Sequence, residues 1–179
     1  MSEQEKICAI FAADPMCFPW GYDEEDDTCI LMKQTMKNEI RRTVENGYTR
    51  FHVAMDNGFG LYAAEYILEL LRKDPRLSLH CFLPNEGQAT KWTPEHRERY
   101  FNTLAGASNV VTVKAEDWTL LDYEAKWAAG EEAQLVITVT SGIMTDSVTE
   151  QAKRDLYTQD ERALTEIDHM YGIHHHQRW

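Results

Sequence analysis

The sequence has few basic residues and no long hydrophobic run. Its 179 residues include 18 Lys plus Arg against 30 Asp plus Glu, which gives a net charge of −12. This balance argues against general binding to DNA, RNA or anionic lipid, because those partners attract basic surfaces. No apolar stretch approaches the ~18–20 residues of a membrane span, and the N-terminal MSEQEK lacks the apolar core of a signal peptide. We therefore expect a cytoplasmic protein that associates with neither nucleic acid nor membrane.

Cysteine and acidic patterns typical of metal sites are also missing. The four cysteines, Cys8, Cys17, Cys29 and Cys81, form no C-x-x-C pair, and three of them lie in or beside apolar runs. They are expected to be free thiols. The acidic run from Asp23 to Asp27 lacks the spacing of a calcium-binding loop. The triplet His174 to His176 is expected in a polar tail, so we predict neither a metal nor a cofactor.

The sequence does contain short apolar runs that alternate with helical patterns. Strands are expected at 6–12, 49–55, 77–83, 109–113 and 134–140. Helices are expected from a cap at Thr28 to Asn46-Gly47, from Leu61 to Asp74, from Thr93 to about Ala105, and over 119–130, 145–156 and 158–171.

Strands that alternate with helices predict an α/β fold. We expect a three-layer Rossmann-like domain with about five mainly parallel strands and helices on both faces. Strands that are apolar along most of their length fit a sheet buried on both sides. The domain is expected to span 1–156, and 157–179 would form a C-terminal helix and a polar, His-rich tail.

Ligands of such folds bind beyond the carboxyl ends of the strands, so the loops that follow each strand carry the candidate site. The segment from Asp56 to Gly60 resembles a phosphate cradle at a helix N-terminus, although a tight turn without a ligand is an equally good interpretation. Asp56 would also repel a phosphate. The candidate ligand-binding residues are Asp14, Asn57, Gly58, Gly60, Glu65, Glu86, Gln88, Trp92, Ser141 and Gly142.

Several of these residues have a second interpretation. Glu65 could face the cleft, or it could be a solvated or ion-paired glutamate. Trp92 could stack on a base or cover the site as an amphipathic side chain. Ser141 and Gly142 could contact phosphate, but the segment has one glycine and continues with Ile143.

Four motifs occur in one order along the chain. They are Pro19-Trp20-Gly21-Tyr22-Asp23-Glu24, Gly58 with Ala63-Ala64-Glu65, Pro84 with Gln88 and Lys91-Trp92, and Arg97-Glu98-Arg99-Tyr100. Together they resemble the SLOG family in its YpsA-like branch. The resemblance is good over 6–115 and looser over 133–156. It implies a Rossmann-like fold and a nucleotide-type ligand, because this superfamily includes enzymes that release a base from nucleoside monophosphates and domains that sense nucleotide-derived signals.

The sequence departs from that branch where the ligand site would lie. The branch usually has Thr-Gly-His-Arg-Pro in the first loop, where this chain has Phe11 to Pro15. Gly60 stands at a position that is usually acidic, and an arginine-rich stretch before the last strand is missing. The family's Gly-Gly-Thr signal after that strand is reduced to Gly142 and Thr145.

These losses weaken a phosphate site, which needs arginines and free glycine amides. We therefore expect a divergent SLOG-like domain that binds a nucleotide-derived or similar small ligand without catalysis. An alternative is a non-catalytic protein-interaction module, in signalling or defence, on a degenerate scaffold. A nucleoside-monophosphate phosphoribohydrolase is a third hypothesis. The family analogy and the apolar residues of the terminal helices also predict a homo-oligomer.

Overall fold

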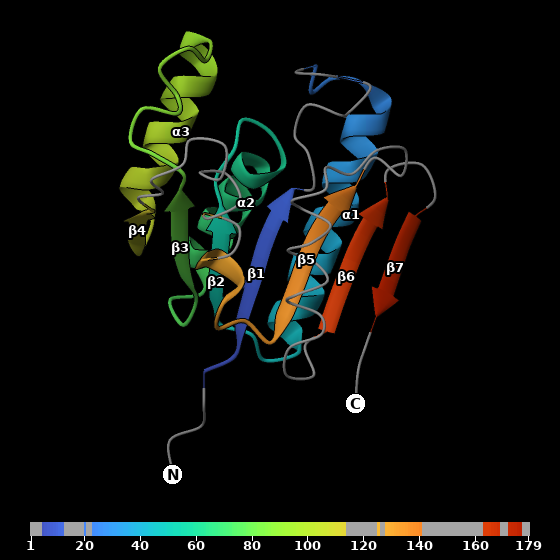
Figure 1. The fold of residues 1–179 in the computed structure, drawn as a ribbon. Helices are drawn as coiled ribbons and strands as arrows, with labels where there is room; N and C mark the ends of the chain where they lie inside the picture. Colours follow the sequence, from blue (N-terminus) through green and yellow to red (C-terminus); the bar gives the residue numbers. More distant parts are fainter. Residues whose placement is uncertain are drawn as a thin grey trace.

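The protein forms a single seven-stranded sheet with helices packed against it (Figure 1). A computed structural model describes residues 5–12, 20, 23–113, 125, 128–140, 163–168 and 172–176. The strands are β1 (Ile7–Ala12), β2 (Arg50–Ala54), β3 (Ser78–Leu83), β4 (Asn109–Thr112), β5 (Leu135–Thr140), β6 (Ala163–Asp168) and β7 (Gly172–His176). The helices are α1 (Asp27–Glu45), α2 (Phe59–Lys73) and α3 (Pro94–Gly106).

The strand order is β4-β3-β2-β1-β5-β6-β7, and every neighbouring pair from β4 to β6 is parallel. The five predicted strands are β1 to β5, so the expected Rossmann-like α/β fold is confirmed. From β1 the chain builds the sheet in one direction through β2, β3 and β4. It then returns to place β5 on the other side of β1. This reversal creates a topological switch point between β1 and β5.

The C-terminal segment contains two strands where a helix and a tail were expected. The predicted helix over 158–171 is wrong at 163–168, because β6 pairs with β5 from Leu135↔Ala163 to Thr140↔Asp168. Thr165 and Ile167 are β-branched and suit a strand that extends the sheet. The expected His-rich tail is wrong at 172–176, which form β7 antiparallel to β6. The predicted helix over 145–156 lies outside the described residues.

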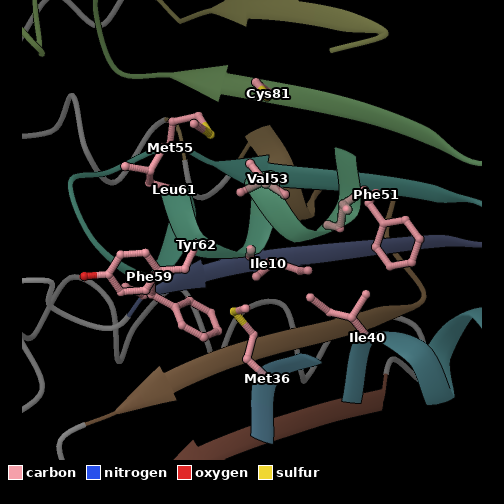
Figure 2. Close-up of a cluster of buried hydrophobic side chains, with 14 of the residues drawn as sticks. Ile10, Met36, Ile40, Phe51, Val53, Met55, Phe59, Leu61, Tyr62 and Cys81 are labelled. Carbon is pink, nitrogen blue, oxygen red and sulfur yellow. The ribbon is translucent and has the colours of Figure 1, made fainter. Parts of the chain in front are cut away.

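Helices α1, α2 and α3 cover one face of the sheet, and Figure 1 shows α1 and α2 behind the strands. The apolar stripe of α1 is buried as its spacing predicts, through Met32, Met36 and Ile40. It packs with α2 against Ile10, Phe51 and Val53 (Figure 2). The described cysteines, Cys8, Cys29 and Cys81, are buried free thiols as expected.

The other face of the sheet is buried as well. Phe11, Phe82 and Val136 form a second apolar cluster with Ala129 and Ala133. The helix expected over 119–130 agrees with the structure at 125 and 128–130, and its other positions are outside the described residues. No helix in the part of the chain that the structure describes is both long and apolar enough to cross a membrane.

The helix ends show how local polar groups fix the elements. Thr93 caps α3 as predicted, because its side chain accepts a hydrogen bond from the His96 N–H at 3.3 Å and Pro94 follows as the first helical residue. The predicted cap of α1 at Thr28 is wrong by two positions. Asp26 is the cap, and it accepts from the Thr28 N–H at 2.9 Å. Any aspartate of this acidic run could accept a hydrogen bond from the first N–H groups of the helix. Composition alone therefore does not predict which of them is the N-cap.

Candidate functional site

The candidate site lies at the carboxyl edge, which we define as the edge of the sheet where the parallel strands end. β1 and β5 end there at Ala12 and Thr140, on either side of the switch point. Crevices at such points are the usual ligand sites of open parallel sheets. Three predicted ligand residues, Asp14, Ser141 and Gly142, follow these two strands and lie outside the described residues.

The predicted phosphate cradle after β2 contains a carboxylate of the protein itself. The Asp56 Oδ1 atom accepts a hydrogen bond from the Gly60 N–H at 3.0 Å, in the first turn of α2. Asp56 is only 7% exposed. Its negative charge therefore already lies where the helix dipole and the free amides would attract an anion. The sequence predicted that Asp56 would repel a phosphate, and its carboxylate does lie at the N-terminus of α2.

Gly60 is required by packing. A Cβ atom at this position would lie 2.4 Å from the Ala54 carbonyl oxygen and 3.3 Å from the Asp56 carboxyl. The preceding Gly58 is the N-cap of α2 and provides no side-chain hydrogen bond there. The D-N-G-F-G segment thus forms a tight strand-to-helix connection.

Asn57 contacts α3. Its Oδ1 atom lies 2.5 Å from His96 Nδ1, and the opposite ring nitrogen, Nε2, lies 3.2 Å from Glu24 Oε2. A histidine near the start of α3 therefore connects the loop after β2 with the residues that precede α1. Asn57 is engaged by a residue of the same chain.

Glu65 belongs to an ionic network that connects three helices. Arg99 on α3 donates to Glu65 from Nε at 3.1 Å and from Nη2 at 2.6 Å. The same guanidinium donates to Glu24 from Nη1 at 2.6 Å and from Nη2 at 2.9 Å. Lys33 on α1 lies 2.5 Å from Glu24 Oε1. We call Glu24, Lys33, Glu65, His96 and Arg99 the edge cluster. The ion-paired interpretation of Glu65 is the one that the structure shows.

The edge cluster strongly lowers the pKa of Glu24, the carboxyl group at its centre. Partial burial acts to raise the pKa of Glu24, but hydrogen bonds and charge from Arg99 and Lys33 outweigh it and lower the pKa to about 2. The hydrogen bonds from Arg99 to Glu24 and Glu65 raise the pKa of the guanidinium. Glu24 is therefore ionised at neutral pH and holds the start of α1 against α2 and α3.

The loop after β3 packs on Tyr100. Gln88 Nε2 donates to the Tyr100 hydroxyl at 2.9 Å, and the Trp92 and Tyr100 rings meet edge to face with centroids 4.9 Å apart. Trp92 is half-buried in this contact, whereas Glu86 is exposed. The two predicted contacts Gln88 and Trp92 thus lie together, and Glu86 is outside that group.

Sequence reasoning missed Tyr62 and Cys29. Tyr62 is on α2, with only 4% of its surface exposed, and Lys33 Nζ lies 4.2 Å from the centre of its ring. Figure 2 shows its hydroxyl pointing towards the carboxyl ends of the strands. Burial raises the pKa of the Cys29 thiol to about 11. A tyrosine within an apolar helix stripe was the available signal, because its polar end still needs a partner.

Metal-binding groups do not gather among the described side chains. No three histidine, cysteine, aspartate or glutamate residues there lie close enough together to hold a metal ion. The triplet His174–His176 belongs to the backbone of β7.

These features define a Rossmann-like α/β domain with a polar cluster at the carboxyl edge of its sheet. A family model for YpsA, described as the YspA SLOG family, matches residues 17–175. The chain therefore belongs to this SLOG family, and the predicted resemblance is confirmed.

The relatives are similar over part of their length. A UPF0398 protein of Brevibacillus brevis is 25% identical over 123 residues, which are 69% of this chain and 63% of that protein. A UPF0398 protein of Lysinibacillus sphaericus is 24% identical over 114 residues, 64% of this chain and 61% of that protein. One of Bacillus velezensis is 27% identical over 103 residues, 57% of this chain and 56% of that protein. The chain thus spans less than two thirds of each of these relatives.

The family motifs converge in space. Trp20 of the first motif is buried in the main core, and Glu24 lies in the edge cluster. Glu65 and Arg99, from the second and fourth motifs, are the partners that complete the ionic network. Tyr100 is fully buried beside Trp92. These motif residues therefore fix the position of the helices around the carboxyl edge.

Proposed function

We propose that this protein is a non-catalytic SLOG domain that binds a small nucleoside-type ligand at the carboxyl edge, without anchoring a phosphate on α2. The observation that carries the proposal is the switch point between β1 and β5. Open parallel sheets usually bind their ligands at such a point, and the strand order that creates it does not depend on the motif changes in the loops.

The charges at the edge support a ligand without a phosphate anchor. Asp56 already accepts the Gly60 N–H, and a second anion beside this buried carboxylate would be repelled. Arg99 could otherwise pair with phosphate, but it donates to both Glu24 and Glu65. A ligand that binds through its base or sugar does not need to displace either group.

The pairing of Glu65 supports a role without catalysis. General acid–base work needs a carboxyl whose proton affinity suits the reaction and whose oxygen can reach the substrate. Both Glu65 oxygens accept hydrogen bonds from Arg99. A carboxylate held in this way positions α2 against α3.

Thermal denaturation with matched ligand pairs tests the proposal. Adenosine, guanosine, cytidine and uridine are each compared with their 5′-monophosphates, at millimolar concentration in a phosphate-free buffer. A ligand at 100 times its Kd adds about 2.7 kcal/mol to the free energy of unfolding, which raises Tm by several degrees. We expect a shift with a nucleoside and no larger shift with its monophosphate.

The outcomes separate the alternatives. A much larger shift with the monophosphate would show that phosphate is bound and would contradict the role given to Asp56. No shift with any compound would contradict small-ligand binding. As a control, Asp56→Ala removes the carboxylate from the start of α2, and we expect it to increase the shift with monophosphates at a cost of about 1 kcal/mol in stability.

A protein-interaction role is a second candidate, favoured by two neighbouring apolar residues at the start of α1. Ile30 and Leu31 are 52% and 62% exposed. Light scattering at tens of micromolar tests whether this patch mediates self-association. An oligomer that becomes a monomer in the double variant Ile30→Lys, Leu31→Lys supports the candidate. A monomeric wild-type protein argues against a homo-oligomer.

A further inference from the structure

The hydroxyl of Tyr62 is a buried polar group without a hydrogen bond. Its geometry satisfies no hydrogen bond to a described residue, and it is shielded from water as well. Its polar neighbour is the Cys29 thiol, which is a weak hydrogen-bonding group. The other fully buried tyrosine, Tyr100, shows the usual arrangement, since its hydroxyl accepts a hydrogen bond from Gln88 at 2.9 Å. An unpartnered buried hydroxyl costs stability, so its retention points to a partner that is supplied from outside the chain.

The hydroxyl faces the candidate site. It points to the carboxyl ends of the strands (Figure 2), and the ionisable groups that act on it come from four different segments. Glu24 precedes α1, Cys29 lies in the first turn of α1, Asp56 follows β2 and Arg99 is on α3. These segments surround the edge of the sheet, so a ligand held there would lie within their reach.

The surroundings limit the kind of atom that this hydroxyl can bind. Burial, with the nearby Glu24 and Cys29, raises the pKa of Tyr62, so the phenol keeps its proton and acts as a donor. Glu24 and Asp56 make the environment unfavourable for an anion, and Arg99 is already paired with two carboxylates. The matching acceptor is therefore neutral, such as a carbonyl oxygen or a ring nitrogen.

We propose that the Tyr62 hydroxyl donates a hydrogen bond to a neutral acceptor atom on the base of a nucleoside ligand, and that it is a specificity-determining residue of this site. This contact depends on the proposed function, and it is the one that would distinguish one base from another. A base offers several such acceptors on its edges, whereas the terminal oxygens of a phosphate share its negative charge.

Three Tyr→Phe variants test this contact. Tyr62→Phe removes the hydroxyl and keeps the ring that packs under Lys33. Tyr66→Phe makes the same change one turn further along α2. Both tyrosines line a groove of about 170 Å³ between α1 and α2, so this variant separates an effect of that groove from an effect at the carboxyl edge. Tyr100→Phe removes a hydroxyl that has a hydrogen-bond partner. Each variant is measured by thermal denaturation alone and by titration with the four nucleosides.

Tyr62→Phe is expected to bind the preferred nucleoside about 10-fold more weakly, the loss for one buried neutral hydrogen bond. Without ligand its Tm should be close to that of the wild-type protein, because only a weak contact with the Cys29 thiol is lost. Tyr66→Phe should leave both quantities unchanged, and Tyr100→Phe should lower Tm.

Two results would overturn the contact while leaving the proposed function intact. One is equal nucleoside affinity in Tyr62→Phe and the wild-type protein. The other is a fall in the Tm of unliganded Tyr62→Phe as large as that of Tyr100→Phe, which would show that the hydroxyl has a structural partner. If no nucleoside stabilises the wild-type protein, the proposed function and this contact both fail.

Discussion

Acidification should destabilise the fold through His52, a histidine of β2 with only 3% of its surface exposed. Its Nε2 atom accepts a hydrogen bond from Arg50 Nε at 2.8 Å, and its Nδ1 atom lies 3.1 Å from the Ala129 carbonyl oxygen. This arrangement needs a neutral ring, since the nitrogen that faces Arg50 must keep its lone pair. Burial, and then the Arg50 charge, lower the pKa of His52 from 6.5 to about 4.

The sign of the effect follows from proton binding. Between pH 6.5 and pH 4 the unfolded chain binds a proton at His52 and the folded protein does not, so the free energy of unfolding falls as the pH falls. Each pKa unit corresponds to about 1.36 kcal/mol, and a shift from 6.5 to about 4 therefore gives at most about 3 kcal/mol. The full stability is present above pH 6.5.

Urea denaturation at several pH values from 7.5 to 4 measures this loss. The control is His52→Gln, whose amide can accept from Arg50 and donate to the Ala129 carbonyl but does not titrate. Subtracting the stability profile of the variant from that of the wild-type protein removes the contribution of other titrating groups. One of these is His80, whose pKa is also lowered by burial. Equal slopes of stability against pH in the two proteins would refute the reasoning.

Three further predictions concern the loop after β2 and the edge cluster. Gly60→Ala should lower stability by roughly 1–3 kcal/mol, because its Cβ would lie 2.4 Å from the Ala54 carbonyl oxygen. Gly87→Ala, whose Cβ would lie 3.5 Å from Thr90 Oγ1, is the matched control and should be nearly neutral in urea denaturation. Arg99→Gln should cost roughly 2–4 kcal/mol, since it leaves two carboxylates without their main partner; a loss below 0.5 kcal/mol would show that solvent screens the pairs. Glu24 should contribute stability that is present above pH 4.5 and is lost as the pH falls towards 2, and Glu24→Gln should remove this part of the acid profile.

The sequence was sufficient to predict the parallel core of the fold. The runs at β1 to β5 are short and apolar, and the segments between them have a helical period, which together determine an α/β sheet. It was insufficient for β6, because Leu164, Ile167 and Tyr171 are spaced three and four residues apart and fit a helix stripe equally well. A six-residue strand does not provide enough alternation to separate the two periods.

The candidate site was harder to predict because its polar residues find partners far along the chain. Asn57 contacts His96, 39 residues away, and Glu65 contacts Arg99, 34 residues away. Spacing in the sequence says nothing about such pairs, so residues that looked available for a ligand are used within the protein. The Asp56 charge at the start of α2 could be predicted because it follows directly from the local strand-to-helix order.

Asp56 has a consequence for any anion that approaches the start of α2. A free anion reaches the Gly60 amide only at its bulk concentration, whereas this carboxylate is attached four residues away and is present at a high, constant effective concentration. Asp56 is therefore a tethered competitor for any anion at the Gly60 amide. An external phosphate would have to displace this carboxylate before it could accept a hydrogen bond from that amide.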